Sequence, residues 1–489
     1  MGANKITNFL RKYMMLIAMV IVIIVFAVIT EGKTLYPINI TSLISQNAYV
    51  FVLGTGMLLC ILTGGNIDLS VGSVVCLAGG VGAIMMTKNI PWPVAVIVML
   101  IMGLLVGLWH GFWIAYVKVP PFIATLVGML AFRGLANIIM GGYAYDISDK
   151  GFLNVFGGGN SCYIPGSYIP DKLGVVKAAF TNYKITGEFT LDAGKLQGTV
   201  DSLQKAIDAG KDDVVNKIAA SIDGVTVEQY LANVDKQLSS LKMNLTAQLN
   251  VTCLIVGLLI AVGFVVFTVV NRKRLIKKGY KVAPLGSTII KTVIIFAVIL
   301  WTAYKLAGYK GIPTALIWIT LVLGLFAYIT TKTTLGRNLY AVGGNEKATR
   351  LSGIDTRKVM FSAYTLMGVL SGFAGVLNIA RLSGSTPTYG VGFEMDAIAA
   401  CFIGGASAYG GTGSIGGVII GAALMGIINQ GMSIADTPVN YQKVVKGIVL
   451  IVAVLFDVIM QMRRKGAKKK KLKKKLKNVV VTEKGGANV

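Results

Sequence analysis

Residues Leu59–Met85 read LCILTGGNIDLSVGSVVCLAGGVGAIM, and Asp68 is their only side chain that is ionised at neutral pH. The low charge extends outward, because Asp68 is also the only ionised side chain among the 54 residues from 34 to 87. A helix needs about 20 apolar residues to cross the hydrocarbon core of a bilayer. A stretch of this length and composition therefore holds more than one membrane crossing, with the glycine pair between them.

The composition of the whole chain indicates a lipid environment. Of the 489 residues, 54% are hydrophobic and only 14% are charged, and the mean hydropathy is +0.70. Soluble domains carry about 25% charged residues. Apolar runs of helical length recur, so we expect an all-α polytopic membrane protein with about 10–12 transmembrane helices, some short and interrupted by glycine. The clearest ones are expected at about 14–30, 46–62, 69–86, 94–116, 120–140, 251–270, 288–306, 313–329, 361–380 and 444–460.

Basic residues orient these helices. The formal net charge is +26, and 11 positive charges lie at Arg463–Lys477, directly after the last expected helix. Basic residues beside membrane segments mark the cytoplasmic side and attract anionic lipid headgroups. We therefore expect a multi-pass cell-membrane protein with both termini in the cytoplasm and a tail that contacts anionic lipid. A nucleic-acid partner is the less favoured explanation of the charge.

Residues 143–249 interrupt the membrane pattern, because they hold 12 of the 21 acidic residues against 10 lysines. Apolar residues at helical spacing within 200–222 predict that this insert is partly helical, and the helix count places it outside the cytoplasm. The expected organisation is a membrane half of about five helices at 1–142, the extracytoplasmic insert at 143–249, an extra helix pair with a basic cytoplasmic loop at 250–310, a second membrane half with a polar cytoplasmic loop (331–358) at 311–462, and a basic cytoplasmic tail at 463–489.

The glycine-rich stretch Gly404–Gly417, GGASAYGGTGSIGG, contains the G-x-G-x-x-G spacing of a dinucleotide site. Such a site needs a strand before the glycines and an amphipathic helix after them, whereas both flanks here are apolar. We expect a flexible break between helices and no cofactor. Glycines spaced by four elsewhere predict closely packed helices. These are Gly103, Gly107, Gly111, Gly368 and Gly372.

Enzyme chemistry is not supported by the sequence. The only histidine, His110, lies in an apolar segment, and no Ser/His/Asp or Cys/His set can be assembled around it. The five cysteines show no metal-binding spacing, and no G-x-x-x-x-G-K-[S/T] pattern for ATP occurs. We expect neither catalytic nor metal-binding residues.

Polar residues at the edges of membrane segments are the candidate functional residues. Asn66 and Asp68 lie in GGNIDLSVGS, and Glu394 and Asp396 lie in GFEMDAIAA. Ionisable groups in such places are costly and tend to face a pathway or an interior partner, so we expect a role in the translocation pathway or its gating. The alternative for Asp68 is capping of the following helix.

The cytoplasmic segment TTLGRNLYAVGGNEKATRLSGIDTRK (333–358) resembles the loop of ABC importer permeases that docks on the ATPase. EKATRLSG (Glu346–Gly353) is a loose version of the E-A-A…G signature, with lysine at a usual alanine position. Further stretches resemble permeases for ribose, galactose and xylose-type monosaccharides, most closely the longer xylose or multiple-sugar type. These are Leu62–Ser73, Gly392–Gly417 and Asn429–Val458.

The resemblance implies a permease subunit that imports a monosaccharide and has no ATPase site of its own. It implies three partners, namely an ABC ATPase, an extracytoplasmic sugar-binding protein and a second copy of the permease. It also implies that ATPase coupling rests on Glu346, Lys347, Arg350 and Gly353. The alternatives are a self-contained ion-coupled secondary transporter or channel and, less favoured, an intramembrane enzyme.

Overall fold

The computed structural model of the chain describes residues 18–157, 250–280, 282, 284–309, 311–455 and 458. It divides into two compact units, one made of Met1–Cys162 and Pro313–Val489 and the other of Tyr163–Ile312. The described part of the first unit contains the helix Ala18–Ile29, η1 (Lys33–Leu35), α2 (Pro37–Gln46), α3 (Ala48–Leu62), α4 (Val71–Thr87), α5 (Trp92–Phe112), the π-turn η2 (Trp113–Val117), α6 (Pro121–Met140), β1 (Tyr145–Asp146), α7 (Lys150–Phe156), α14 (Thr314–Lys332), α15 (Thr334–Gly344), α16 (Glu346–Leu351), α17 (Thr356–Leu382), β2 (Gly384–Ser385), α18 (Phe393–Ile403), α19 (Ile415–Ile434) and helical residues 439–455.

The fold class expected from the sequence is confirmed. Among the described residues, seven helices are long and apolar enough to cross a membrane, or eight if α2 and α3, which meet at a bend of 41°, form one span. The helix Ala18–Ile29 and α4 are shorter and also apolar. The protein is therefore an all-α polytopic membrane protein, with one two-stranded β pairing in the described part.

Local sequence sets the helix ends. Pro121 begins α6, where its missing N–H would have no partner, and Gly141 ends that helix with a left-handed φ of 61°. Asp355 caps α17 by accepting from the backbone N–H groups of Arg357 and Lys358 at 3.1 and 3.2 Å. These caps explain why several helix boundaries could be read from the sequence.

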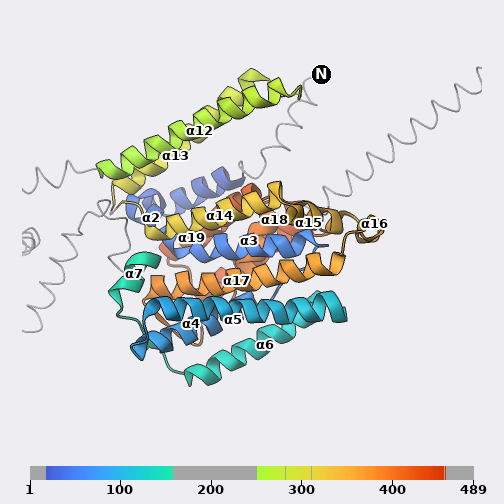
Figure 1. Cartoon of the computed structure of the whole chain (residues 1–489). Helices are drawn as coiled ribbons and strands as arrows, with labels where there is room; N and C mark the ends of the chain where they lie inside the picture. The colour runs from blue at the N-terminus through green and yellow to red at the C-terminus, as the bar shows by residue number, and fades with distance from the viewer. Residues whose placement is uncertain are drawn as a thin grey trace, which may run out of the picture. The chain divides into compact units, whose positions relative to one another are not determined.

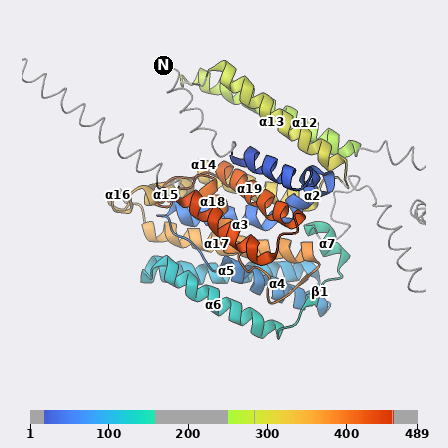
Figure 2. The ribbon, with the colours of Figure 1, turned by 180° about the vertical axis from the view of Figure 1, so that it is seen from behind.

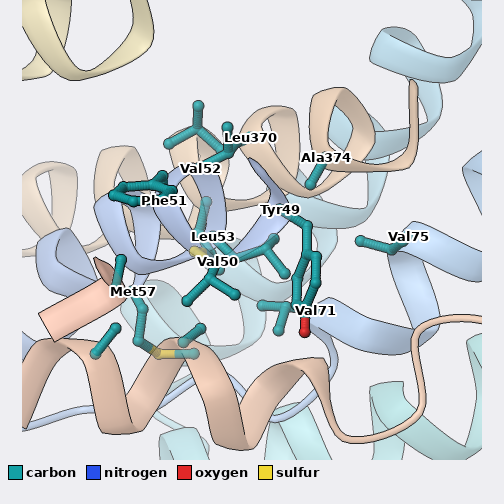
Figure 3. Close-up of a cluster of buried hydrophobic side chains, with 14 of the residues drawn as sticks. Tyr49, Val50, Phe51, Val52, Leu53, Met57, Val71, Val75, Leu370 and Ala374 are labelled. Carbon is teal, nitrogen blue, oxygen red and sulfur yellow. The ribbon is translucent and has the colours of Figure 1, made fainter. Parts of the chain in front are cut away.

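Helix α3 lies at the centre of the first unit, and each of its residues is buried. Figure 3 shows its side chains against Val71 and Val75 of α4 and against Leu370 and Ala374 of α17. The side of α17 that faces away from α3 packs on α5, with backbone touching backbone. A Cβ added to Gly368 of α17 would lie 2.6 Å from the Cα of Gly107 in α5. The glycine spacing that predicted close helix packing thus lies at a helix contact.

The structure adds detail that the sequence did not predict. Helix α2 forms a separate element before α3, and β1 pairs antiparallel with β2 through Tyr145 and Ser385. Helix α7 contacts α5, α14 and α17, so the first part of the expected insert, residues 145–156, belongs to the first unit. The rest of that insert, from 158 to 249, and the basic tail at 463–489 lie outside the described residues.

The second unit contains an antiparallel helix pair, α12 (Val251–Lys277) and α13 (Leu285–Ala307). The backbone N–H of Asn250 donates to the carbonyl oxygen of Ala307 at one end of the pair, and Arg272 donates to the hydroxyl of Thr288 near the other, at 3.1 and 2.8 Å. Helix α12 continues beyond residue 270, where the apolar run ends, because lysine and arginine are good helix formers. Two helices therefore lie within residues 250–310, while the assignment of their connecting loop to the cytoplasm stays a prediction.

Candidate functional site

A non-helical segment, residues 386–392, joins β2 to α18 and runs beside α4. The Cys76 thiol donates to the carbonyl oxygen of Pro387 at 3.5 Å, and farther along, the backbone of Gly390 contacts that of Gly72. Gly390 has a φ of 78°, which only glycine adopts readily. Non-helical backbone within a membrane protein must be covered by protein or line a water-filled cavity. The contacts with Cys76 and Gly72 pack this non-helical backbone against α4.

Arg133 of α6 holds this segment in place. Its guanidinium donates to the carbonyl oxygens of Pro387, at 3.2 Å, and Tyr389. These two carbonyls lie outside the helices, and a charged donor binds them more strongly than a neutral one would. Arg133 was not among the functional residues predicted from the sequence. Its signal was present, because it is the only ionised side chain between Lys118 and Asp146.

Glu394 lies in the first turn of α18, next to the beginning of α4. A Cβ built on Gly72 would come within 2.6 Å of a Glu394 carboxylate oxygen. Because Gly72 is the second residue of α4, the carboxylate lies at the positive end of that helix dipole. The Glu394 side chain is half-buried.

Asp396, in the same turn, has none of its surface exposed. One carboxylate oxygen accepts from the Tyr49 hydroxyl at 2.6 Å and from the Asn429 amide at 3.4 Å. Lys446 forms an ion pair with the carboxylate at 3.0 Å. This cluster joins α3, α18, α19 and helical residues 439–455. Lys446 was missed because it lies 50 residues from its partner in the sequence.

Asp68 and Asn66 lie in the turn between α3 and α4. Asp68 is 3% exposed, and one of its carboxylate oxygens accepts from the backbone N–H and the hydroxyl of Ser70 at 2.8 and 2.6 Å. Ser70 is the N-cap residue of α4, and no side chain caps the first turn of that helix, so Asp68 fixes the turn before α4 and does not cap the helix itself. Asn66 donates its amide to the hydroxyl of Thr63 at 3.1 Å. A pathway role for these two residues, as for Glu394 and Asp396, stays a prediction.

The polar loop at 331–358 forms two short helices, α15 and α16, at one end of the first unit (Figure 1). Asn345 separates them and caps α16 by accepting from the N–H of Ala348 at 3.1 Å. A Glu346 carboxylate oxygen accepts from the Thr356 hydroxyl at 3.3 Å, which ties α16 to the start of α17. Gly353 turns the chain between them with a φ of 83°.

The outward surface of α16 suits a protein contact. Lys347 and Arg350 are exposed, and Leu351 is 89% exposed, the highest value among the large hydrophobic side chains that the structure describes. The side chains of Lys347, Arg350 and Leu351 are therefore open to contact from outside the bundle. A groove of about 430 Å³ lies alongside, lined by residues of α15, of α17 and of the turn before α17, among them Gly353, Asp355 and Lys358.

The stretch 404–417 forms the turn between α18 and α19, which Figure 2 shows next to one another. Ser414 caps α19 by accepting from the N–H of Gly417 at 3.1 Å, and Gly411 donates its N–H to the carbonyl oxygen of Leu62 at 3.1 Å. The glycines therefore contact this chain's own backbone. The turn lies at the end of the bundle that carries α15, which the sequence places on the cytoplasmic side.

Comparisons with known proteins agree on one class. The profile described as the permease component of the branched-chain amino acid transport system matches residues 39–159 and 239–454. The chain is 32% identical to the xylose transport system permease protein XylH of Haemophilus influenzae over 450 residues, which are 92% of this chain and 96% of the relative. The protein of the same name from Escherichia coli K12 is 31% identical over 451 residues, 92% of each chain.

A second group of relatives matches a shorter region. The ribose import permease protein RbsC of Escherichia coli K12 is 47% identical over 148 residues, which are 30% of this chain and 46% of the relative. No solved structure matches the chain significantly.

Proposed function

Since the chain belongs to the family of permease components that this profile describes, we propose that it is the transmembrane permease subunit of an ATP-binding-cassette importer for a monosaccharide. The observation that carries the proposal is the similarity to xylose transport permeases over 92% of this chain. Xylose and ribose, which name the relatives, are both pentoses, so we expect a pentose as cargo.

The geometry of α16 supports coupling to a separate ATPase. Glu346 ties the helix to the start of α17, Asn345 caps its first turn, and Lys347, Arg350 and Leu351 are exposed. An ATPase that closes on ATP would push this helix, while the sugar passes near segment 386–392 elsewhere in the same unit. A sugar-binding protein outside the membrane would deliver the cargo. A second copy of the permease would complete the pathway, with both termini in the cytoplasm and the basic tail on anionic lipid.

The test uses the full-length chain expressed with the ATPase encoded for the same importer. We expect the two to co-purify, and sugar uptake into liposomes to require ATP and the binding protein. Leu351→Ser removes the exposed apolar contact and should weaken ATPase association. Tyr143→Ser, at the far end of α6 and 71% exposed, is the matched control and should leave association unchanged. Full uptake by this chain alone, driven by a cation gradient, would overturn the proposal in favour of a secondary transporter.

A further inference from the structure

Three segments that are distant in the sequence meet without side chains between them. Gly343 near the end of α15 contacts the carbonyl oxygen of Leu62 and the backbone nitrogen of Gly411, because a Cβ on Gly343 would overlap both. A Cβ on Gly410 would lie 2.5 Å from the Cα of Gly64, and one on Gly65 would overlap the carbonyl oxygen of Ala408. We call this contact of 62–65, Gly343 and 408–411 the glycine junction.

Two hydrogen bonds hold the junction together. The N–H of Gly411 donates to the carbonyl oxygen of Leu62 at 3.1 Å, and the Tyr340 hydroxyl donates to the carbonyl oxygen of Gly413 at 2.9 Å. Burial raises the pKa of Tyr340, so its hydroxyl keeps its proton at neutral pH. Leu339, one residue before Tyr340, is fully buried and anchors α15 in the core. The end of α15 therefore cannot shift without moving its two neighbours.

The junction lies between α16 on one side and helices α4 and α18 on the other. Only Gly344 and Asn345 separate Gly343 from the first residue of α16. In the other direction, 62–65 leads through Asp68 into α4, and 408–411 follows α18, which carries Glu394 and Asp396. Backbone in direct contact has no flexible side chain to absorb a displacement, and close-packed interiors transmit strain.

We propose that the glycine junction transmits ATPase movement from α16 to the segments that border the pathway, with Gly343 and Tyr340 as its positioning residues. The inference rests on the proposed function. A side chain at Gly343 would separate the three segments, and the ATPase would then bind and hydrolyse ATP without moving α4 and α18 in step.

The experiment compares Gly343→Ala with Gly344→Ala in the complex of permease, ATPase and binding protein. Both glycines lie in the last turn of α15 and neither has a positive φ, yet a Cβ on Gly344 meets nothing within 4 Å. We expect Gly344→Ala to behave as the parent protein. In Gly343→Ala we expect uptake to fall about tenfold, towards the low end of typical couplings between sites, while ATPase association and ATP hydrolysis persist. The ATP consumed per sugar should rise by the same factor.

A purely structural role would change protein yield and thermal midpoint but not the ATP consumed per sugar in the folded complex, and that result would overturn the proposal. Equal uptake by the two alanine variants would overturn it as well. If Gly343→Ala does not fold, Tyr340→Phe tests the proposal instead, because it removes only the hydrogen bond to Gly413. An unchanged ratio of ATP consumed to sugar transported in Tyr340→Phe would then contradict the proposed role of the glycine junction. Failure of the parent chain to associate with the ATPase would instead contradict the proposed function.

Discussion

Replacing Asp396 with asparagine keeps the size of the side chain and removes its charge. Asp396 accepts from Tyr49 at 2.6 Å and pairs with Lys446 at 3.0 Å, and its side chain is 1% exposed. The substitution leaves the ammonium of Lys446 without its ionic partner. We expect it to destabilise the contact of α18 with helical residues 439–455, and with it the first unit.

The size of the effect follows from burial. Removing one member of a fully buried ion pair costs about 3–5 kcal/mol. The Lys446 side chain is 23% exposed, so partial hydration lowers its cost. The Tyr49 hydrogen bond also weakens, because bonds to charged acceptors are worth about 1.5–3 kcal/mol and neutral ones about 1 kcal/mol. We expect a loss of about 3 kcal/mol in the free energy of unfolding, or about 100-fold in the folding equilibrium.

Equilibrium unfolding in mixed detergent micelles, followed by tryptophan fluorescence, measures this loss. The matched variants are Lys446→Met and the double variant Asp396→Asn/Lys446→Met, which removes both charges. Since the double variant leaves no unpaired charge, it should be more stable than the sum of the single changes implies, by about 2 kcal/mol. Strict additivity of the two changes would refute the reasoning, because it would show that the two groups do not depend on each other.

Three further substitutions test other contacts. Gly368→Ala places a methyl group against the backbone of α5 and should cost about 1–3 kcal/mol in the same unfolding assay, whereas Gly324→Ala, with nothing within 4 Å, should not destabilise. Arg133→Gln replaces the charged donor that holds segment 386–392 with a neutral one, so we expect faster protease cleavage of that segment and lower uptake. Unchanged cleavage would show that Arg133 does not hold the segment in place. Asn345→Ala removes the cap of α16 and should cost about 1 kcal/mol of local stability. ATPase co-purification should drop in Asn345→Ala and recover in Asn345→Asp, whose side chain can also cap the helix. If Asn345→Asp does not recover, the drop is not caused by loss of the cap.

Helix positions could be predicted from the sequence where composition changes sharply. Helix α6 was expected at 120–140 and lies at Pro121–Met140, because a proline pair and a glycine mark its ends. Helix α12 was expected to end near 270, and it ends at Lys277 because hydropathy reports the membrane boundary while helix geometry continues through basic residues. The bend between α2 and α3 has no proline or glycine to indicate it.

The candidate site was predicted as a set of residues but not as a geometry. Asp396 and Glu394 were selected because charges are costly in membrane segments. Their surroundings differ, since Asp396 is fully buried beside Lys446 while Glu394 is half-buried next to α4. Neither partner could be assigned without knowing which helices are adjacent. The contact of Gly343 with Gly411 likewise depends on tertiary packing, because glycine has no side chain whose chemistry points to a partner.

The glycine junction also affects how this transporter can change over evolution. Its contacts are made by carbonyl oxygens, backbone nitrogens and Cα atoms, which are the same whatever sugar is carried. If the sugar passes near segment 386–392, as proposed, the residues around that segment can be exchanged to suit a different cargo while the glycine junction keeps its form. On the proposed function, cargo choice and energy supply are therefore separable properties of this chain. A chimera that takes the loop 331–358 from another permease should also take the two glycine-containing segments that contact it, 62–65 and 408–411, from that permease.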